Sequence, residues 1–251
     1  MILVLLVVVI VLLVAILVLR RRRHGSPIPK IIHQIACEPL ADPESWPASW
    51  KKCQETWKRL HPDFEYVLWT DDSLDRFMKR EFPDFYPSWR AYDQNIKRID
   101  TARYFILYRY GGIYADMDCE CIQRFYEKLP SGKASIGESP WHQKFGERFQ
   151  NSLMASSPEH PFWEIVIAVV VERLPRCVDG GHVLQCTGPD VINEAAKRYV
   201  ANGSFGINAL DRRKYAGNEK NESLASTRGM YVVHYGTEMW NEDIKSRASA
   251  A

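Results

Sequence analysis

Two aspartates separated by one residue lie in the segment YGGIYADMD, residues 110–118. Asp116 and Asp118 follow a short apolar run that predicts a strand, and side chains at i and i+2 of a strand point to the same face. Two carboxylates on one side of a site suit Mg²⁺ or Mn²⁺, which keep coordination positions open for substrate phosphates. Most Asp-x-Asp pairs are solvated turns, but a position after an apolar strand favours a metal site.

The elements before this segment must position the two aspartates. Residues 96–110 carry apolar side chains at spacings of three and four, which predicts a helix that leads into the turn at Gly111 and Gly112. Asp100 and Arg103 lie three positions apart and share a face of that helix. A surface ion pair without function is the simpler interpretation of these two residues. The direct connection to the carboxylate pair favours a role at the site instead.

Strands and helices alternate along the chain, which predicts an α/β layered fold. Besides the strand before Asp116, the predicted strands are residues 30–36, 64–69, 119–122, 134–138, 152–155 and 231–234. The predicted helices are residues 50–60, 72–80, 84–92, 96–110, 162–174 and 188–200. Thr70 or Asp71 can cap the helix that follows the second strand.

The first part of the chain predicts a membrane anchor. Residues 2–19 are apolar without interruption, and as a helix they span roughly 27 Å, close to the thickness of a hydrocarbon core. The features of a cleaved signal peptide are not evident. We therefore divide the chain into an anchor with its basic flank, residues 1–24, and one folded domain, residues 25–251.

The sequence features that indicate the orientation of this anchor in the membrane conflict with one another. Four arginines follow the apolar segment at residues 20–23, and the positive-inside rule then places the folded domain in the cytosol. Two glycosylation sequons, at Asn202 and Asn221, and an even number of cysteines are compatible with a lumen. Cys177 and Cys186 flank a glycine-containing turn and are the pair that we expect to form a disulfide. The sequence alone leaves the orientation open.

The charge balance excludes one class of partner. The net charge of the chain is +2, and the four arginines beside the anchor exceed it, so the rest of the chain is slightly acidic. No basic stripe runs through the folded domain, and we expect no nucleic-acid partner.

Four segments occur together in the order of one enzyme family: IPKIIHQI at residues 28–35, FEYVLWTD at 64–71, RIDTARY at 98–104 and YGGIYADMD at 110–118. Together they resemble the family 32 glycosyltransferases, whose sugar-binding region carries a DXD motif, and the resemblance covers residues 27–240. Within the family, NSLMAS at residues 151–156 followed by PEHPF at 158–162 is similar to fungal inositol-phosphorylceramide mannosyltransferases and initiating α-1,6-mannosyltransferases.

The resemblance implies a GT-A fold, a Rossmann-like mixed sheet flanked by helices, with a nucleotide-sugar donor, Mn²⁺ or Mg²⁺, and retention of anomeric configuration. It implies transfer of a hexose, mannose from GDP-mannose, to a glycolipid or glycan acceptor. The expected location is the Golgi membrane, with the domain in the lumen, although the positive-inside rule disagrees. UDP-galactose or another UDP-sugar is the alternative donor, and a non-catalytic sugar-nucleotide-binding module is the alternative class.

The resemblance also assigns roles to residues. The expected catalytic residues are Asp116, Asp118, Asp100 and Arg103, and the last two match positions that hold the hydroxyls of the donor sugar. The expected metal ligands are Asp116, Asp118 and His234, although a histidine at the edge of the core is the simpler interpretation of His234. The expected contacts to the donor are Tyr114, Gly112, Ile35, Trp240 and Asn151.

A glycosidase-like use of the two aspartates is unfavourable. Hydrolases place their carboxylates about 5 to 9.5 Å apart on opposite sides of the scissile bond, whereas this pair is expected to share one face. We therefore expect no covalent nucleophile, and our hypothesis is that the leaving diphosphate itself deprotonates the acceptor hydroxyl.

Overall fold

The computed structural model describes residue 5 and residues 26–139, 148–203, 206–216 and 229–237. The predicted membrane anchor, residues 2–19, lies outside the described residues apart from Leu5, and Trp240 and Asn221 lie outside them as well. Among the helices formed by the described residues, none combines the length and the apolar character needed to cross a membrane.

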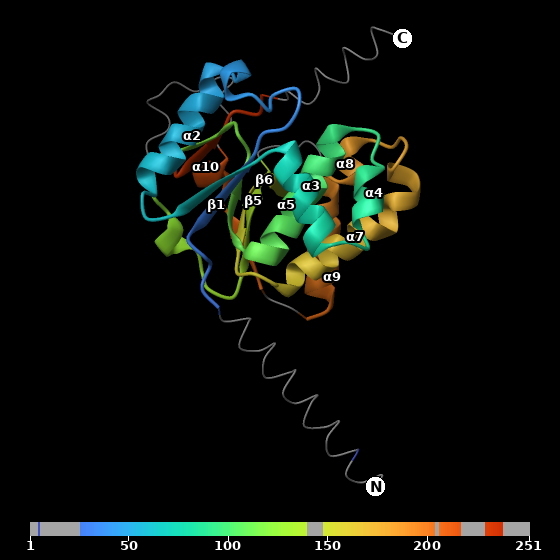
Figure 1. The fold of residues 1–251 in the computed structure, drawn as a ribbon. Coiled ribbons are helices and arrows are strands. Elements are labelled where there is room, and N and C mark those ends of the chain that lie inside the picture. The colour runs from blue at the N-terminus through green and yellow to red at the C-terminus, as the bar shows by residue number, and fades with distance from the viewer. Residues whose placement is uncertain (1–4, 6–25, 140–147, 204–205, 217–228, 238–251) are drawn as a thin grey trace.

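A six-stranded mixed sheet forms the centre of the molecule, in the order β2-β1-β3-β6-β5-β7 (Figure 1). Its strands are β1 (Ile31–Ile35), β2 (Glu65–Trp69), β3 (Gly112–Ala115), β5 (Ala134–Glu138), β6 (Phe149–Ser156) and β7 (Ile207–Leu210). β1 is parallel to both β2 and β3, β6 is antiparallel to β3 and β5, and β7 is parallel to β5. A separate antiparallel pair consists of β4 (Cys119–Cys121) and β8 (Val232–His234).

Helices cover both faces of the large sheet (Figure 1). One face carries α3 (Asp71–Glu81), α4 (Tyr86–Arg90), α5 (Asn95–Tyr110), α7 (Pro161–Cys177), α8 (Val183–Cys186) and α9 (Pro189–Ala201). The other face carries α2 (Ala48–Leu60), α10 (Arg212–Tyr215) and the β4–β8 pair. Two short 3₁₀ turns, Pro43–Ser45 and Tyr126–Lys128, complete the described elements. The apolar core therefore consists of two layers, one on each side of the sheet.

The turn between α5 and β3 depends on the absence of side chains. Gly111 and Gly112 have φ angles of 64° and 88°, which side-chain-bearing residues rarely adopt. A Cβ on Gly111 would lie 2.6 Å from the backbone nitrogen of Pro158. The turn thus brings α5, which is buried along most of its length, directly into the central strand β3.

Most of the elements predicted from the sequence are confirmed, with boundaries shifted by a few residues. Thr70 caps α3, because its hydroxyl accepts the Ser73 amide at 3.4 Å. The strand predicted over residues 119–122 is β4, and it pairs with β8 in a separate sheet rather than with the six-stranded one. The elements β7, α8 and α10 were not predicted.

Candidate active site

The DXD segment forms a turn at the carboxyl end of β3. β3 ends at Ala115, and the Cys119 amide donates to the Asp116 carbonyl at 3.0 Å, which closes a turn over residues 116–118. The prediction that both aspartates project from an extended strand is therefore wrong in its local structure. The Asp116 amide donates to the Ser152 carbonyl at 2.8 Å, so strand β6 fixes the start of the turn.

Arg103 is the centre of the charged cluster beside this turn. Its side chain is buried in α5, and its guanidinium pairs with Asp100 at 2.8 Å and with Asp116 at 3.0 Å. The same group donates to the Asn151 carbonyl at 3.0 Å and lies over the Tyr114 ring, 4.9 Å from its centroid. Burial opposes the charged form of Arg103, but the surrounding acidic groups raise its pKa, so the guanidinium stays charged.

The two carboxylates beside Arg103 are buried to different degrees. Burial raises the pKa of Asp100 to about 6, although Arg103 and the hydrogen bonds from Thr187 and Asn151 favour its charged form. Burial likewise raises the pKa of Asp116, against the effect of Arg103. The Asp116 side chain is 26% exposed and that of Asp100 is 7% exposed, so Asp116 is the carboxylate of this pair that a bound ligand can reach.

Asp118 belongs to a second cluster, formed with the far end of the chain. Its Oδ1 lies 3.3 Å from Nε2 of His234. Its Oδ2 accepts hydrogen bonds from the amide and the hydroxyl of Thr237 at 2.8 and 2.9 Å. Burial favours the neutral acid, but His234 and Thr237 more than compensate and hold the pKa of Asp118 well below its usual range. Asp118 is therefore ionised at neutral pH.

This second cluster has the donor chemistry of a divalent cation site. Ligand atoms of Asp118, Cys119 and His234 lie within 4.8 Å of one another. Burial raises the pKa of the Cys119 thiol far above its usual range, and its Sγ donates to the Ser152 carbonyl at 3.7 Å. A thiol is also softer than the oxygen and nitrogen ligands that Mn²⁺ prefers. An ionised carboxylate and an imidazole remain, and both suit Mn²⁺. The residues present thus fit the metal that the resemblance implies.

Of the other residues that we expected to contact the donor, some lie at the two charged clusters and one lies away from them. Tyr114 donates its hydroxyl to Oδ1 of Asp116 at 2.7 Å, and Asn151 donates its amide to Oδ1 of Asp100 at 3.1 Å. Ile35 ends β1, which runs parallel to β3 and reaches the same edge of the sheet. Gly112 lies at the opposite end of β3 from the aspartates and packs against the backbone of Ile31, so the structure does not bring it to this cluster.

An irregularity in β6 explains how Asn151 reaches Arg103. β6 pairs with β5 at Met154 opposite Ile136 and again at Phe149 opposite Glu138, so β6 contains more residues than β5 between these pairs. Such a bulge redirects side chains and leaves backbone groups unpaired within the sheet. The Asn151 and Ser152 carbonyls are used here for Arg103 and Asp116.

Three site residues were missed by the sequence interpretation. The Gln34 amide donates to the Asp116 carbonyl at 3.1 Å, the Thr187 hydroxyl donates to Asp100 at 3.2 Å, and Thr237 holds Asp118. All three are polar residues that act on the site over long sequence separations. Gln34 lies in one of the segments that carry the resemblance, at residues 28–35, but nothing in that segment indicates its contact with Asp116. Thr187 and Thr237 carry no charge, and no local pattern indicates their contacts with the carboxylates.

Comparison with known proteins agrees with this arrangement. A family model described as the glycosyltransferase sugar-binding region containing the DXD motif matches residues 47–137. An inositol phosphoceramide mannosyltransferase of Schizosaccharomyces pombe is 39% identical over 168 residues, which cover 64% of this chain and 43% of that protein. A mannosyl phosphorylinositol ceramide synthase of Saccharomyces cerevisiae is 41% identical over 173 residues, which cover 68% of this chain and 43% of that protein. The chain thus spans less than half the length of these curated relatives.

Solved structures show the same fold. The PaToxG glycosyltransferase superimposes with a TM-score of 0.53 at 19% identity, covering 75% of this chain and 77% of that one. The ligand-free glycosyltransferase domain of the YGT toxin superimposes with a TM-score of 0.52 at 9% identity, covering 73% of this chain and 80% of that one. The mixed sheet with helices on both faces is therefore a GT-A glycosyltransferase fold, as the resemblance implied. Residues 47–137 of this chain are therefore similar to the sugar-binding region, with its DXD motif, of these glycosyltransferases.

Proposed function

We propose that this protein is a retaining, metal-dependent hexosyltransferase that moves mannose from GDP-mannose to a glycolipid or glycan acceptor. Curated relatives with 39% and 41% identity are named as mannosyltransferases or synthases of mannosylated inositol phosphoceramide, which supports mannose and a sphingolipid acceptor. The observation that carries the proposal is the pair of charged clusters at the end of β3, one centred on Arg103 and one on Asp118.

The Arg103 cluster is suited to holding a sugar in a fixed orientation. Asp100 accepts hydrogen bonds from Asn151 and Thr187 and pairs with Arg103. Because Asp100 is buried, it acts on the sugar through Arg103, which also holds Asp116. Asp116 is fixed by Arg103 and Tyr114 and is partly exposed, so it can accept from the sugar or the ribose. Groups held in this way restrict the reacting sugar to one geometry.

The Asp118 cluster is suited to the diphosphate end of the donor. Asp118 and His234 would hold Mn²⁺ or Mg²⁺, and Thr237 fixes the carboxylate of Asp118 in an ionised state. A divalent cation bound there supplies charge neutralisation for the departing diphosphate. The charged Arg103, which pairs with Asp116, adds positive charge near the same end of β3.

The hydrogen-bonding of the two aspartates disfavours a covalent mechanism. Both oxygens of Asp118 are engaged by His234 and Thr237, and Oδ1 of Asp116 is engaged by Arg103 and Tyr114. A carboxylate bound in this way is a weaker nucleophile. Transfer with retention then requires that the leaving diphosphate take the proton of the acceptor hydroxyl.

A donor screen with the full chain in detergent tests this function. GDP-mannose, UDP-galactose, UDP-glucose and UDP-N-acetylglucosamine are each supplied with Mn²⁺ or with a chelator, with and without inositol phosphoceramide as acceptor. We expect turnover of GDP-mannose that requires the cation. Turnover of a UDP-sugar alone would assign the alternative donor, and binding without turnover of any donor would assign a non-catalytic module.

We also propose that the protein is a single-pass Golgi membrane protein with residues 25–251 in the lumen. The disulfide between Cys177 and Cys186 supports this orientation, because disulfides persist in oxidising compartments and are rare in the cytosol. Protease treatment of sealed microsomes tests it. Protection of the domain until detergent is added is expected, whereas digestion in intact microsomes would place the domain in the cytosol, as the positive-inside rule has it.

A further inference from the structure

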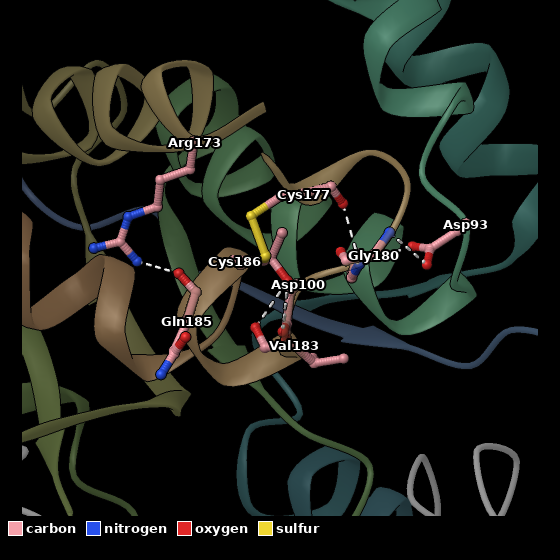
Figure 2. The surroundings of a disulfide bond; sticks show 10 residues. Asp93, Asp100, Arg173, Cys177, Gly180, Val183, Gln185 and Cys186 are labelled. Atoms are coloured by element: carbon pink, nitrogen blue, oxygen red, sulfur yellow. Dashed lines mark hydrogen bonds and ion pairs between the residues drawn. A yellow bond between two sulfur atoms is a disulfide. The ribbon is translucent and has the colours of Figure 1, made fainter. Parts of the chain in front are cut away.

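A disulfide links the end of α7 to α8, in the segment that leads to Thr187 and its contact with Asp100. Cys177, at the end of α7, is bonded to Cys186 in α8, with 5.5 Å between their Cα atoms (Figure 2). Both cysteines are buried. The bond therefore restricts the conformation of residues 178–185, and it restricts the position of Thr187, the residue that follows Cys186.

The start of this segment is held by a buried lysine of α5. The Lys97 side chain is 0% exposed, and its ammonium donates to Oδ1 of Asp93 at 2.7 Å, to the Cys177 carbonyl at 3.0 Å and to the Gly180 carbonyl. Asp93 also accepts the Gly180 amide at 3.1 Å and donates its own amide to the Val178 carbonyl at 2.9 Å. A buried ammonium is costly unless it is fully paired, and three oxygen acceptors satisfy it here.

The end of the segment is held by the next turns of the same helix. The Thr187 hydroxyl donates to Oδ2 of Asp100 at 3.2 Å, and the Tyr104 hydroxyl donates to the Thr187 carbonyl at 2.7 Å. Thr187 is 0% exposed. The other acceptor near its hydroxyl is the Val183 carbonyl, at the longer distance of 3.5 Å. Asn151 and Arg103 hold Oδ1 of Asp100, so Thr187 contributes the contact to Oδ2 that completes the orientation of the carboxylate.

We propose that Thr187 is a positioning residue for the donor-sugar site, and that the Cys177–Cys186 disulfide and Lys97 act through it by fixing its hydroxyl against Asp100. The inference deepens the proposed function and rests on it. Asp100 in turn pairs with Arg103, and Arg103 pairs with Asp116, so the segment is connected to the partly exposed carboxylate by an unbroken series of polar contacts. Packing alone would explain a buried disulfide, but it does not require a hydroxyl pointed at Asp100.

A conservative pair of variants separates positioning from packing. Thr187→Val keeps the shape of the side chain and removes the hydroxyl, and we expect it to lower kcat/KM for the donor about tenfold, because a hydrogen bond to a charged group is lost. Thr187→Ser keeps the hydroxyl and is expected to stay within about twofold of wild type. If the valine variant, the serine variant and the wild type all have the same activity and the same thermal stability, the proposal is overturned.

Reduction tests the role of the disulfide in the full chain. A phosphine reductant is expected to lower kcat/KM of the wild type several-fold at a temperature where circular dichroism shows no unfolding. The Cys177→Ala/Cys186→Ala double variant is the matched control, since it should start at the reduced level and show no response to the reductant. A wild type that keeps full activity after its Cys177 and Cys186 thiols have been shown to be free contradicts the proposal.

A readout without turnover distinguishes failure of this inference from failure of the proposed function. The ¹³C signal of the Asp100 carboxyl group is expected to move on reduction in the wild type and to stay unchanged in the double variant. If no donor is turned over but this signal responds, the proposed function fails and the positioning role of the segment stands. If donor is turned over and the signal does not respond to reduction, the positioning role fails alone.

Discussion

Asp118 and His234 meet across the two-stranded sheet, with 3.3 Å between Oδ1 and Nε2, although they lie in distant parts of the chain. Asp118 directly precedes β4, and Cys119, the first residue of β4, pairs with His234 in the β4–β8 ladder. Thr237 then fixes the other carboxylate oxygen. This relationship makes the divalent cation the first point at which the proposed function can be tested.

Removal of the Asp118 charge is expected to abolish cation-dependent transfer. Asp118→Asn keeps the shape of the side chain and removes an anionic ligand, so we expect initial rates at least about 100-fold lower. His234→Gln should raise the Mn²⁺ concentration that gives half-maximal activity by about tenfold or more. Rates are measured over a Mn²⁺ series and with a chelator. Asp63→Asn, on an exposed carboxylate that pairs with Lys30 and Arg124, is the control expected to behave as wild type.

Replacement of Arg103 by lysine is expected to reduce activity despite conservation of charge. An ammonium cannot bridge Asp100, Asp116 and the Asn151 carbonyl as the guanidinium does, so kcat/KM for the donor should fall about 10- to 100-fold. Arg103→Met leaves the buried carboxylate of Asp100 and the partly exposed one of Asp116 without a counter-charge, and it should lower the free energy of unfolding by about 3 kcal/mol.

The control for Arg103 is an arginine of the same helix. Arg109 pairs with Glu81 at 2.6 Å, but its side chain is 47% exposed. Arg109→Lys and Arg109→Met are expected to change stability by less than about 1 kcal/mol and leave activity intact. If substitution at Arg109 were as costly as at Arg103, burial of the Arg103 cluster would not be the cause of the effect.

Stability is expected to fall as the pH is lowered from 6.5 to 4, in part because of His33. Its Nε2 donates to the Gly111 carbonyl at 3.0 Å, and its Nδ1 accepts from Trp69 at 3.2 Å, so the neutral ring satisfies both partners. Burial lowers the pKa of His33 to about 4 from its usual 6.5, against the effect of the Gly111 hydrogen bond. Between these values the unfolded chain binds a proton that the folded chain does not, and the folded state loses up to about 3 kcal/mol.

Denaturant titrations of the wild type and of His33→Gln at pH 7.5 and pH 5 measure this contribution. The wild type should lose more stability between the two pH values than the variant does, because the glutamine does not titrate. Carboxylates common to both proteins cancel in the comparison. Parallel losses in the two proteins would show that His33 is protonated in the folded state as readily as in the unfolded chain.

The turn before β3 is expected to tolerate no side chain at Gly111. Gly111→Ala combines a φ of 64° with a Cβ placed 2.6 Å from the Pro158 nitrogen, and it should destabilise the fold by about 2 to 3 kcal/mol. Gly203→Ala is the matched control, because its φ is 75° but no atom lies within 4 Å of the added Cβ. We expect about 1 kcal/mol there. Equal losses in thermal or chemical unfolding would assign the whole effect to backbone conformation.

Local patterns predicted the elements that carry strong periodicity. The helix predicted over residues 96–110 is α5, and the strand predicted over residues 134–138 is β5, with the same bounds. The disulfide between Cys177 and Cys186 was also predicted, because the turn between them brings their ends together. In these cases the neighbours that decide the structure are close in sequence.

The features that could not be predicted from the sequence depend on contacts between residues that lie far apart in the chain. Residues 119–122 have the composition of a strand, but only the partner β8 decides to which sheet β4 belongs. The bulge of β6 that directs Asn151 towards Arg103 depends on the register with β5. Thr187 and Thr237 reach the carboxylates through tertiary contacts alone, and no local pattern marks them.

The pairing of β4 with β8 has a consequence for biosynthesis. His234 and Thr237 follow Asp118 by more than 110 residues. The ribosome therefore releases Asp118 well before the residues that complete its cluster, and the cluster can form only after β8 has been synthesised and has paired with β4. A chain that stops before β8 lacks both the imidazole and the threonine, so we expect it to emerge inactive.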